Sequence, residues 1–193
     1  MTQQPSPAPS AQNPDIELQS LFKIQYGMYV ISSVDGNKLN GQIATTVMQV
    51  TNEPVKLTAC LSKDTLTHDM IMKSRVFGIS VLDTKTTINL IGCFGFHSGR
   101  DYDKFEHVPY TIGATGCPLL KKNTLANIEV RVTEVVDIQT HTLFIGDVVT
   151  ASEVAFGSAM TYEYYHKELK GRSPKNAPTY HVSQAVSHQP DKK

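Results

Sequence analysis

The sequence predicts a mainly β protein built on an antiparallel barrel of about six long strands. Apolar and polar residues alternate with a period of two in several segments, most clearly from Ile128 to Thr133. Helical segments are few and short, whereas a doubly wound parallel sheet needs a helix after most strands. Asp35-Gly36-Asn37 lies between two alternating segments and is a typical hairpin turn. Together these features favour an antiparallel barrel.

The expected strands follow from this alternation and from the residues that interrupt it. The turn at Asp35-Gly36-Asn37 separates the first two strands, and Pro54 marks the start of the third. Gly146 is expected at a bend in the last strand. The six segments are 28–34, 39–50, 55–61, 77–82, 128–133 and 141–149.

Four segments have helical character. We expect an N-terminal helix over 15–22, a helix over 67–74, and a last helix over 161–169. Asp83 or Thr84 is expected to cap a further helix that carries Ile88, Leu90, Ile91 and Phe94. The glycine-containing stretch from 92 to 118 is predicted to form long surface loops, which often carry binding residues.

Composition and charge limit the class of protein. A chain of 193 residues is long enough for one domain with a sizeable core. The formal net charge is zero, so the basic footprint of a nucleic-acid-binding protein is missing. No apolar run is long enough to span a bilayer, so we expect no membrane partner. Residues 1–14 and 183–193 are predicted to be disordered tails around a domain at 15–182, and the first does not resemble a signal peptide.

The cysteines indicate a reducing compartment. The chain has three, Cys60, Cys93 and Cys117, and none forms a C-x-x-C pair. An iron or zinc site of the rubredoxin type needs paired thiolates, so we expect no metal site. Cys60 lies in an apolar strand and is predicted to be a small core residue. We expect a cytoplasmic location.

Two polar clusters flank the strand at 55–61. The first runs from Asn40 to Thr46, and the second runs from Leu61 to His68, where a strand turns into a helix. A helix start presents free N–H groups and the positive end of the helix dipole, which suit a phosphate. Small hydroxyl side chains on the neighbouring strand leave room for a flat ring. The alternative is an ordinary capped helix beside a threonine-rich strand.

The same clusters resemble the flavin reductase-like family of FMN-binding split barrels. The resemblance covers residues 18 to 180 and includes Ser98-Gly99-Arg100-Asp101, Gly116-Cys117-Pro118 and His141 to Val148. The C-terminal segments Tyr164-Tyr165-His166 and Gly171 to Tyr180 are similar to the flavin reductase module of high-molecular-weight rubredoxins. The resemblance implies a six-stranded Greek-key split barrel, bound FMN, NADH or NADPH as substrate, and a homodimer.

The resemblance also implies which residues bind the cofactor. The FMN phosphate would lie near Ser62, Lys63 and Thr67, although many family members have Asn in place of Ser62. Ser98 and Arg100 would supply a second arm, since an Arg side chain fits phosphate oxygens in a bidentate way. The isoalloxazine ring would lie over 44–46 and bind through its pyrimidine edge. The other residues implied to bind the cofactor are Gln42, Ala44, Thr45, Thr46, Cys60, Leu61 and Phe105, with Cys60 near the edge of the flavin.

Hydride transfer needs no general base, so we assign no catalytic residue. His141 and Tyr165 are expected to hold the nicotinamide nucleotide, although a lone His at the start of a strand is more often a surface residue. The resemblance predicts an NAD(P)H-dependent flavin reductase or flavoprotein oxidoreductase, and the similarity to rubredoxin-fused modules favours the second of the three functions that stay open. The protein could release reduced flavin, it could retain FMN and pass electrons to a rubredoxin-like protein on another chain, or it could be a non-enzymatic FMN-binding or electron-carrier module.

Overall fold

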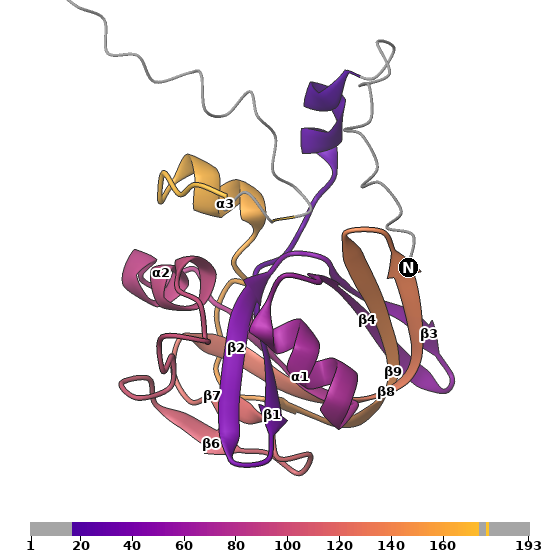
Figure 1. The fold of residues 1–193 in the computed structure, drawn as a ribbon. Helices are drawn as coiled ribbons and strands as arrows, with labels where there is room; N and C mark the ends of the chain where they lie inside the picture. The colour runs from indigo at the N-terminus through magenta and orange to yellow at the C-terminus, as the bar shows by residue number, and fades with distance from the viewer. Residues whose placement is uncertain (1–16, 174–176, 178–193) are drawn as a thin grey trace, which may run out of the picture.

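The computed structural model describes residues 17–173 and 177, and its main body is an antiparallel sheet of seven strands (Figure 1). The predicted tails at 1–14 and 183–193 lie outside the described residues. The sheet has the order β2-β1-β5-β8-β9-β4-β3. Its strands are β1 (Tyr29–Asp35), β2 (Lys38–Ala44), β3 (Val47–Asn52), β4 (Val55–Ser62), β5 (Val76–Leu82), β8 (Thr124–Ile138) and β9 (His141–Glu153). The mainly β, antiparallel fold is therefore confirmed.

The predicted strand at 39–50 is two strands. β2 pairs with β1, whereas β3 pairs with β4, so the chain changes partner at Thr45 and Thr46. At this point the Cys60 N–H donates to the Thr46 carbonyl across 3.0 Å. β2 and β4 also contact each other, so the sheet curls into a barrel that is split where β2 ends. The split raises the strand number from six to seven.

In the part of the chain that the structure describes, three α-helices and a 3-10 helix accompany the sheet. The 3-10 helix covers Leu18–Lys23 and overlaps the helix predicted at 15–22, and α3 covers Tyr162–Lys167. α1 (Leu66–Ser74) lies over β1 and β2 and faces the β8–β9 hairpin (Figure 1). α2 (Ile88–Phe96) is capped by Thr87, whose side chain accepts from the Leu90 N–H. The prediction of Asp83 or Thr84 as this cap was wrong.

The predicted loop region at 92–118 is more structured than expected. α2 occupies its start, and a small two-stranded sheet, β6 (Tyr110–Ile112) and β7 (Pro118–Leu120), occupies its end. β8 and β9 are also longer than predicted and form one extended hairpin with two register shifts.

Two hydrophobic clusters fill the protein. One lies inside the barrel and includes Ile31, Phe77 and Phe144. The other lies between β1, α2 and α3 and includes Phe94 and Tyr165. Within the described part of the chain, no helix is both long and apolar enough to cross a bilayer.

Candidate functional site

A cavity of about 300 Å³ opens where the barrel splits. This volume is at the lower end of the range for small-molecule and cofactor sites. Its wall combines the end of β2, the end of β4, the start of α1, the α2 helix with the loop that follows it, and the segment after α3. The lining residues include Gln42, Ala44, Thr45, Cys60, Leu61, Ser62, Thr65, Thr67, Phe94, Phe96, His97, Ser98, Lys104, Tyr165 and Ser173.

The start of α1 forms one side of this cavity. Thr65 is the N-cap and accepts from the His68 N–H, while its own hydroxyl donates to the Ser62 carbonyl across 3.0 Å. The Ser62 hydroxyl accepts from the Asp64 N–H. The helix itself makes no use of the N–H groups of Leu66 and Thr67, because they belong to its first turn. This side of the cavity is suited to an anion.

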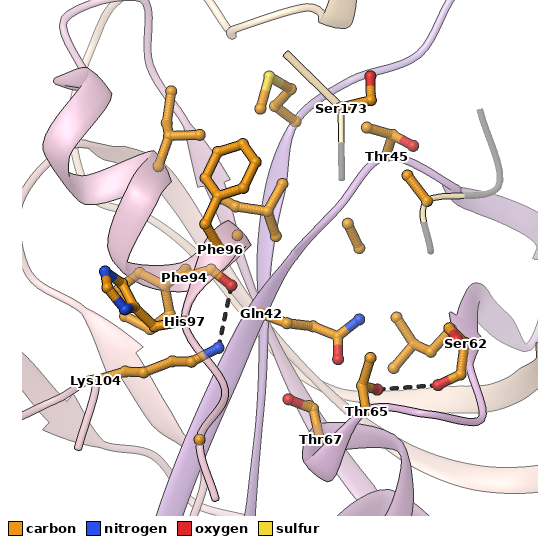
Figure 2. A pocket seen from close by; sticks show the side chains of 18 of the residues that line it. Gln42, Thr45, Ser62, Thr65, Thr67, Phe94, Phe96, His97, Lys104 and Ser173 are labelled. Carbon is orange, nitrogen blue, oxygen red and sulfur yellow. Dashed lines mark hydrogen bonds between the residues drawn. The ribbon is translucent and has the colours of Figure 1, made fainter. Parts of the chain in front are cut away.

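Two polar atoms in the cavity wall are buried without a hydrogen-bond partner among the described residues. They are Oε1 of Gln42, on β2, and Oγ1 of Thr45, which directly follows this strand. Figure 2 shows Gln42 reaching across the cavity toward Thr65 and Thr67. A buried polar atom without a partner costs roughly 1–3 kcal/mol, so this wall is suited to a ligand with a hydrogen-bonding edge.

Nine of the predicted site residues line this single cavity. These residues are far apart in the sequence, because they come from both polar clusters, from the loop after α2 and from α3. The nine are Gln42, Ala44, Thr45, Cys60, Leu61, Ser62, Thr67, Ser98 and Tyr165. Burial raises the pKa of the Cys60 thiol, as expected for a small residue of the wall.

The other five predicted residues, Thr46, Lys63, Phe105, Arg100 and His141, are not part of the lining. Thr46 contributes its carbonyl to the β3–β4 junction. Lys63 forms an ion pair with Asp137 at 2.7 Å. Phe105 is buried in the second core cluster, with its ring 5.2 Å from that of Phe94.

Arg100 belongs to a polar network that holds α1 in place. Its guanidinium pairs with Asp69 at 2.7 Å and, with His68, holds the pKa of that carboxyl below its usual range, against the effect of burial. The His68 ring bonds the Thr142 hydroxyl at 2.9 Å. The network therefore joins the loop after α2, the first turns of α1, and β9.

His141 lies directly behind the cavity wall. It is paired in register with Ser62 across β4 and β9. Its Nδ1 bonds the Thr140 hydroxyl at 2.9 Å, and its Nε2 is buried without a partner among the described residues.

The segment after α3 closes one side of the cavity. The Tyr165 hydroxyl donates to the Arg172 carbonyl at 3.0 Å, and Ser173 then reaches the cavity. Tyr165 itself is 2% exposed and packs in the second core cluster. The aromatic side chains of α3 thus pack within the chain. Of the segment Gly171 to Tyr180 that carries part of the resemblance, residues 174–176 and 178–180 lie outside the described residues.

Lys104 was not predicted. It is 5% exposed, and its ammonium donates to the carbonyls of Gly41 at 2.8 Å and Phe94 at 3.1 Å. Burial lowers its pKa to about 8. Its surroundings in sequence, Asp101 to Phe105, have the composition of a polar loop and give no signal of a buried cation.

A family model described as "Flavin reductase like domain" matches residues 21–172. The chain therefore belongs to the flavin reductase family, and the resemblance found in the sequence is confirmed. Among curated proteins, it is 39% identical to a ferric-chelate reductase (NAD(P)H) of Archaeoglobus fulgidus, over 87% of this chain and 99% of the relative. It is 41% identical to a high molecular weight rubredoxin of Moorella thermoacetica, over 86% of this chain and 73% of the relative.

Solved structures share the fold. An FMN-binding protein from Thermus thermophilus superposes with a TM-score of 0.64 at 25% identity, covering 78% of this chain and 82% of that chain. The NADH:FAD oxidoreductase SgcE6 of Streptomyces globisporus gives a TM-score of 0.65 at 24% identity, covering 77% of this chain and 89% of that chain. The family match makes a flavin the class of cofactor to test against the cavity.

Proposed function

We propose that this protein is an NAD(P)H-dependent flavoprotein oxidoreductase that binds FMN in the cavity at the split of the barrel. The observation that carries the proposal is a pair of buried oxygens, on Gln42 and Thr45, that have no partner among the described residues and lie beside the start of α1. Bound flavin would supply the hydride-accepting chemistry, while the protein supplies binding and orientation.

The donors and acceptors of the wall fit FMN. The pyrimidine edge of the flavin ring offers an N–H donor at N3 between two carbonyl acceptors. Gln42 Oε1 needs a donor and the Thr45 hydroxyl can serve an acceptor, so the pair complements this edge. The phosphate would bind the N–H groups that open α1, with the hydroxyls of Ser62 and Thr67 beside them.

The cations predicted for the phosphate take indirect roles in this proposal. Lys63 and Arg100 each pair with a carboxylate, Asp137 and Asp69 respectively. Arg100 would hold the first turn of α1 in position through Asp69, and the phosphate would rely on backbone N–H groups. FMN is proposed as the cofactor because its single phosphate matches the one helix start, that of α1, which the described cavity wall presents.

The nicotinamide nucleotide would approach the exposed face of the flavin. We propose that His141 and Tyr165 help to hold it. His141 has an Nε2 without a partner in the part of the chain that the structure describes and is paired with Ser62 of the wall, and Tyr165 lies in the wall itself. Positioning contacts of this kind act by bringing the reacting atoms to roughly 3–3.5 Å.

Electrons would then pass to free flavin or to a rubredoxin-like protein on another chain. The named activity of the Archaeoglobus relative adds ferric chelates to the acceptors to be tested. We further propose a cytoplasmic homodimer. The three cysteines, all within the described residues, are free, which agrees with a reducing compartment. Light scattering at micromolar concentration tests the dimer, and a monomer there would contradict it.

Absorbance spectroscopy tests the proposed function. Purified protein mixed with FMN should retain it through gel filtration, and anaerobic NADH or NADPH should bleach its visible absorption. FMN that is retained but not reduced by either nucleotide would leave the non-enzymatic electron-carrier alternative. Failure to retain FMN would overturn the site.

Matched variants test the wall. Thr45→Val and Gln42→Leu should each weaken FMN binding by about 1 kcal/mol, the typical net value of one hydrogen bond. Thr111→Val changes an exposed residue of β6 in the same way and should leave the affinity unchanged. Fluorescence quenching of FMN on titration with protein measures all three.

A further inference from the structure

Lys104 places a buried positive charge in the cavity wall. Its ammonium carries three N–H donors, and among the described residues two carbonyls, of Gly41 and Phe94, accept from it. The Phe94 carbonyl belongs to the last turn of α2, where the negative end of the helix dipole favours a cation. One N–H is left for a ligand in the cavity.

The described residues give Lys104 no carboxylate partner, in contrast to three less buried lysines. Lys63, Lys73 and Lys167 each pair with an Asp or Glu within 2.8 Å. Burying a charge without a counter-charge is costly, and strongly perturbed groups of this kind concentrate at functional sites. The low pKa of Lys104, about 8, agrees with this cost.

The titratable groups around Lys104 come from three elements. The Cys93 thiol of α2 donates to the Lys104 carbonyl at 3.6 Å, and burial raises its pKa. The loop after α2 contributes the stacked pair His97 and Tyr102, and also Asp103, which accepts from the Phe105 N–H. Asp64, before α1, is an exposed lining residue. β2 faces the cavity with the neutral side chains Asn40 and Gln42.

The position of Lys104 points to the ring of the cofactor and not to its phosphate. Figure 2 shows Lys104 on one side of Gln42, while Ser62, Thr65 and Thr67 lie on the other. Its bond to the Gly41 carbonyl also fixes the strand residue directly before Gln42. The same side chain thus supplies a charge and holds the proposed ring contact.

We propose that Lys104 sets the reduction potential of the bound flavin, because its ammonium favours the reduced, anionic flavin over the oxidised, neutral ring. The inference rests on the proposed function. A hydride carries two electrons and one proton from NAD(P)H to the flavin, which leaves oxidised nucleotide and one added negative charge on the ring. Lys104 exchanges no atom in this step. It stabilises the added charge.

Potentiometry of the FMN-loaded protein tests the inference. Replacing Lys104 by Met keeps the length of the side chain and removes its charge. We expect Lys104→Met to lower the preference for reduced over oxidised FMN about tenfold, which is about 30 mV for a two-electron couple. Lys73→Met removes an equal charge from an exposed site paired with Asp35 and should leave the potential unchanged.

The wild-type protein provides a second measurement, which needs no variant. An anionic ligand raises the pKa of a nearby lysine, so Lys104 should lose its proton above pH 8 in the complex. The potential of bound FMN, relative to free FMN, should therefore fall as pH rises through this range. Lys104→Met should lack this fall.

The outcomes separate the two proposals. If wild-type protein binds no FMN, the proposed function fails and the role of Lys104 fails with it. If FMN binds and its potential and pH dependence are the same in wild type and Lys104→Met, only the role of Lys104 is overturned. If Lys104→Met weakens the binding of oxidised and reduced FMN equally, the role of Lys104 is also overturned, because its ammonium then does not favour the reduced flavin.

Discussion

At the scale of single residues, Lys104 has a consequence for stability that needs no cofactor. Burial lowers its pKa from 10.5 to about 8. Between these values the unfolded chain holds a proton that the folded chain does not, so the free energy of unfolding rises with pH. The rise amounts to about 3 kcal/mol. Urea unfolding across this range should show the rise in wild type and not in Lys104→Met, and parallel pH profiles would contradict it.

His141 gives the second prediction for a single residue. His141→Ala should slow reduction of bound FMN by NAD(P)H about tenfold, or roughly 1.4 kcal/mol, because one positioning contact is lost. FMN affinity should stay near normal, since His141 lies outside the lining. Anaerobic stopped-flow measures the step. His107→Ala, at an exposed histidine, is the control, and a wild-type rate in His141→Ala would make His141 structural.

Residue-level chemistry could be predicted where it depends on neighbours in sequence. Ser62 and Thr67 were found because a strand-to-helix boundary is visible in the sequence. Lys63 and Arg100 have the right charge for phosphate, but their carboxylate partners lie 74 and 31 residues away. Such pairing depends on the fold, and so does the burial of Lys104.

At the scale of elements, Glu129 of β8 holds the loop before β7 in place through hydrogen bonds. Its carboxylate accepts from the N–H groups of Ala114 and Thr115 and from the hydroxyls of Thr115 and Thr150. Burial raises its pKa, but these hydrogen bonds outweigh burial and bring the pKa below its usual value. A Cβ at Gly113 would lie 2.4 Å from the carboxylate, so a larger residue there would displace the carboxylate from these hydrogen bonds.

Glu129→Gln should destabilise the protein by about 1–3 kcal/mol at neutral pH, because an amide NH₂ replaces an acceptor among donors. A lowered carboxyl pKa gives stability that is present above the unfolded value and is lost as pH falls, so the difference should shrink in acid. Denaturant unfolding of wild type and Glu129→Gln at pH 7 and at about pH 4 measures the loss of stability and its decrease in acid. Glu134→Gln, exposed on the same strand, should have little effect.

The elements themselves were largely predictable, but their partners were not. The alternation from 39 to 50 continues through Thr45 and Thr46, so the sequence does not indicate that β2 and β3 pair with different strands. The split depends on where β1 and β4 lie. Likewise, Thr87 and Thr84 are equally good caps by composition, and the turn that Asp83 makes with the Lys85 N–H moves the helix start to Thr87.

At the scale of the whole molecule, a ligand that binds only the folded protein must stabilise it. FMN at one hundred times its dissociation constant should add about 2.7 kcal/mol. For a chain of this size the melting temperature should rise by roughly 5–10 °C. Riboflavin, which lacks the phosphate, should give a smaller rise at equal concentration. Differential scanning fluorimetry measures the melting temperature with each ligand. Equal rises with FMN and riboflavin would show that the start of α1 does not bind the phosphate.

The pairing of β4 with β9 affects how the molecule is made. Lys56 to Ser62 bonds with His141 to Asp147, so the strand that ends at the cavity finds this partner only after some eighty further residues have been added. Ribosomes add about 5–20 residues per second, so for several seconds β4 has β3 as its only hydrogen-bonded strand partner. Contacts this distant in sequence also slow folding. The cavity wall at Ser62 is therefore complete only once β9 has been synthesised and paired, so we expect a nascent chain that lacks β9 to be unable to retain the proposed cofactor.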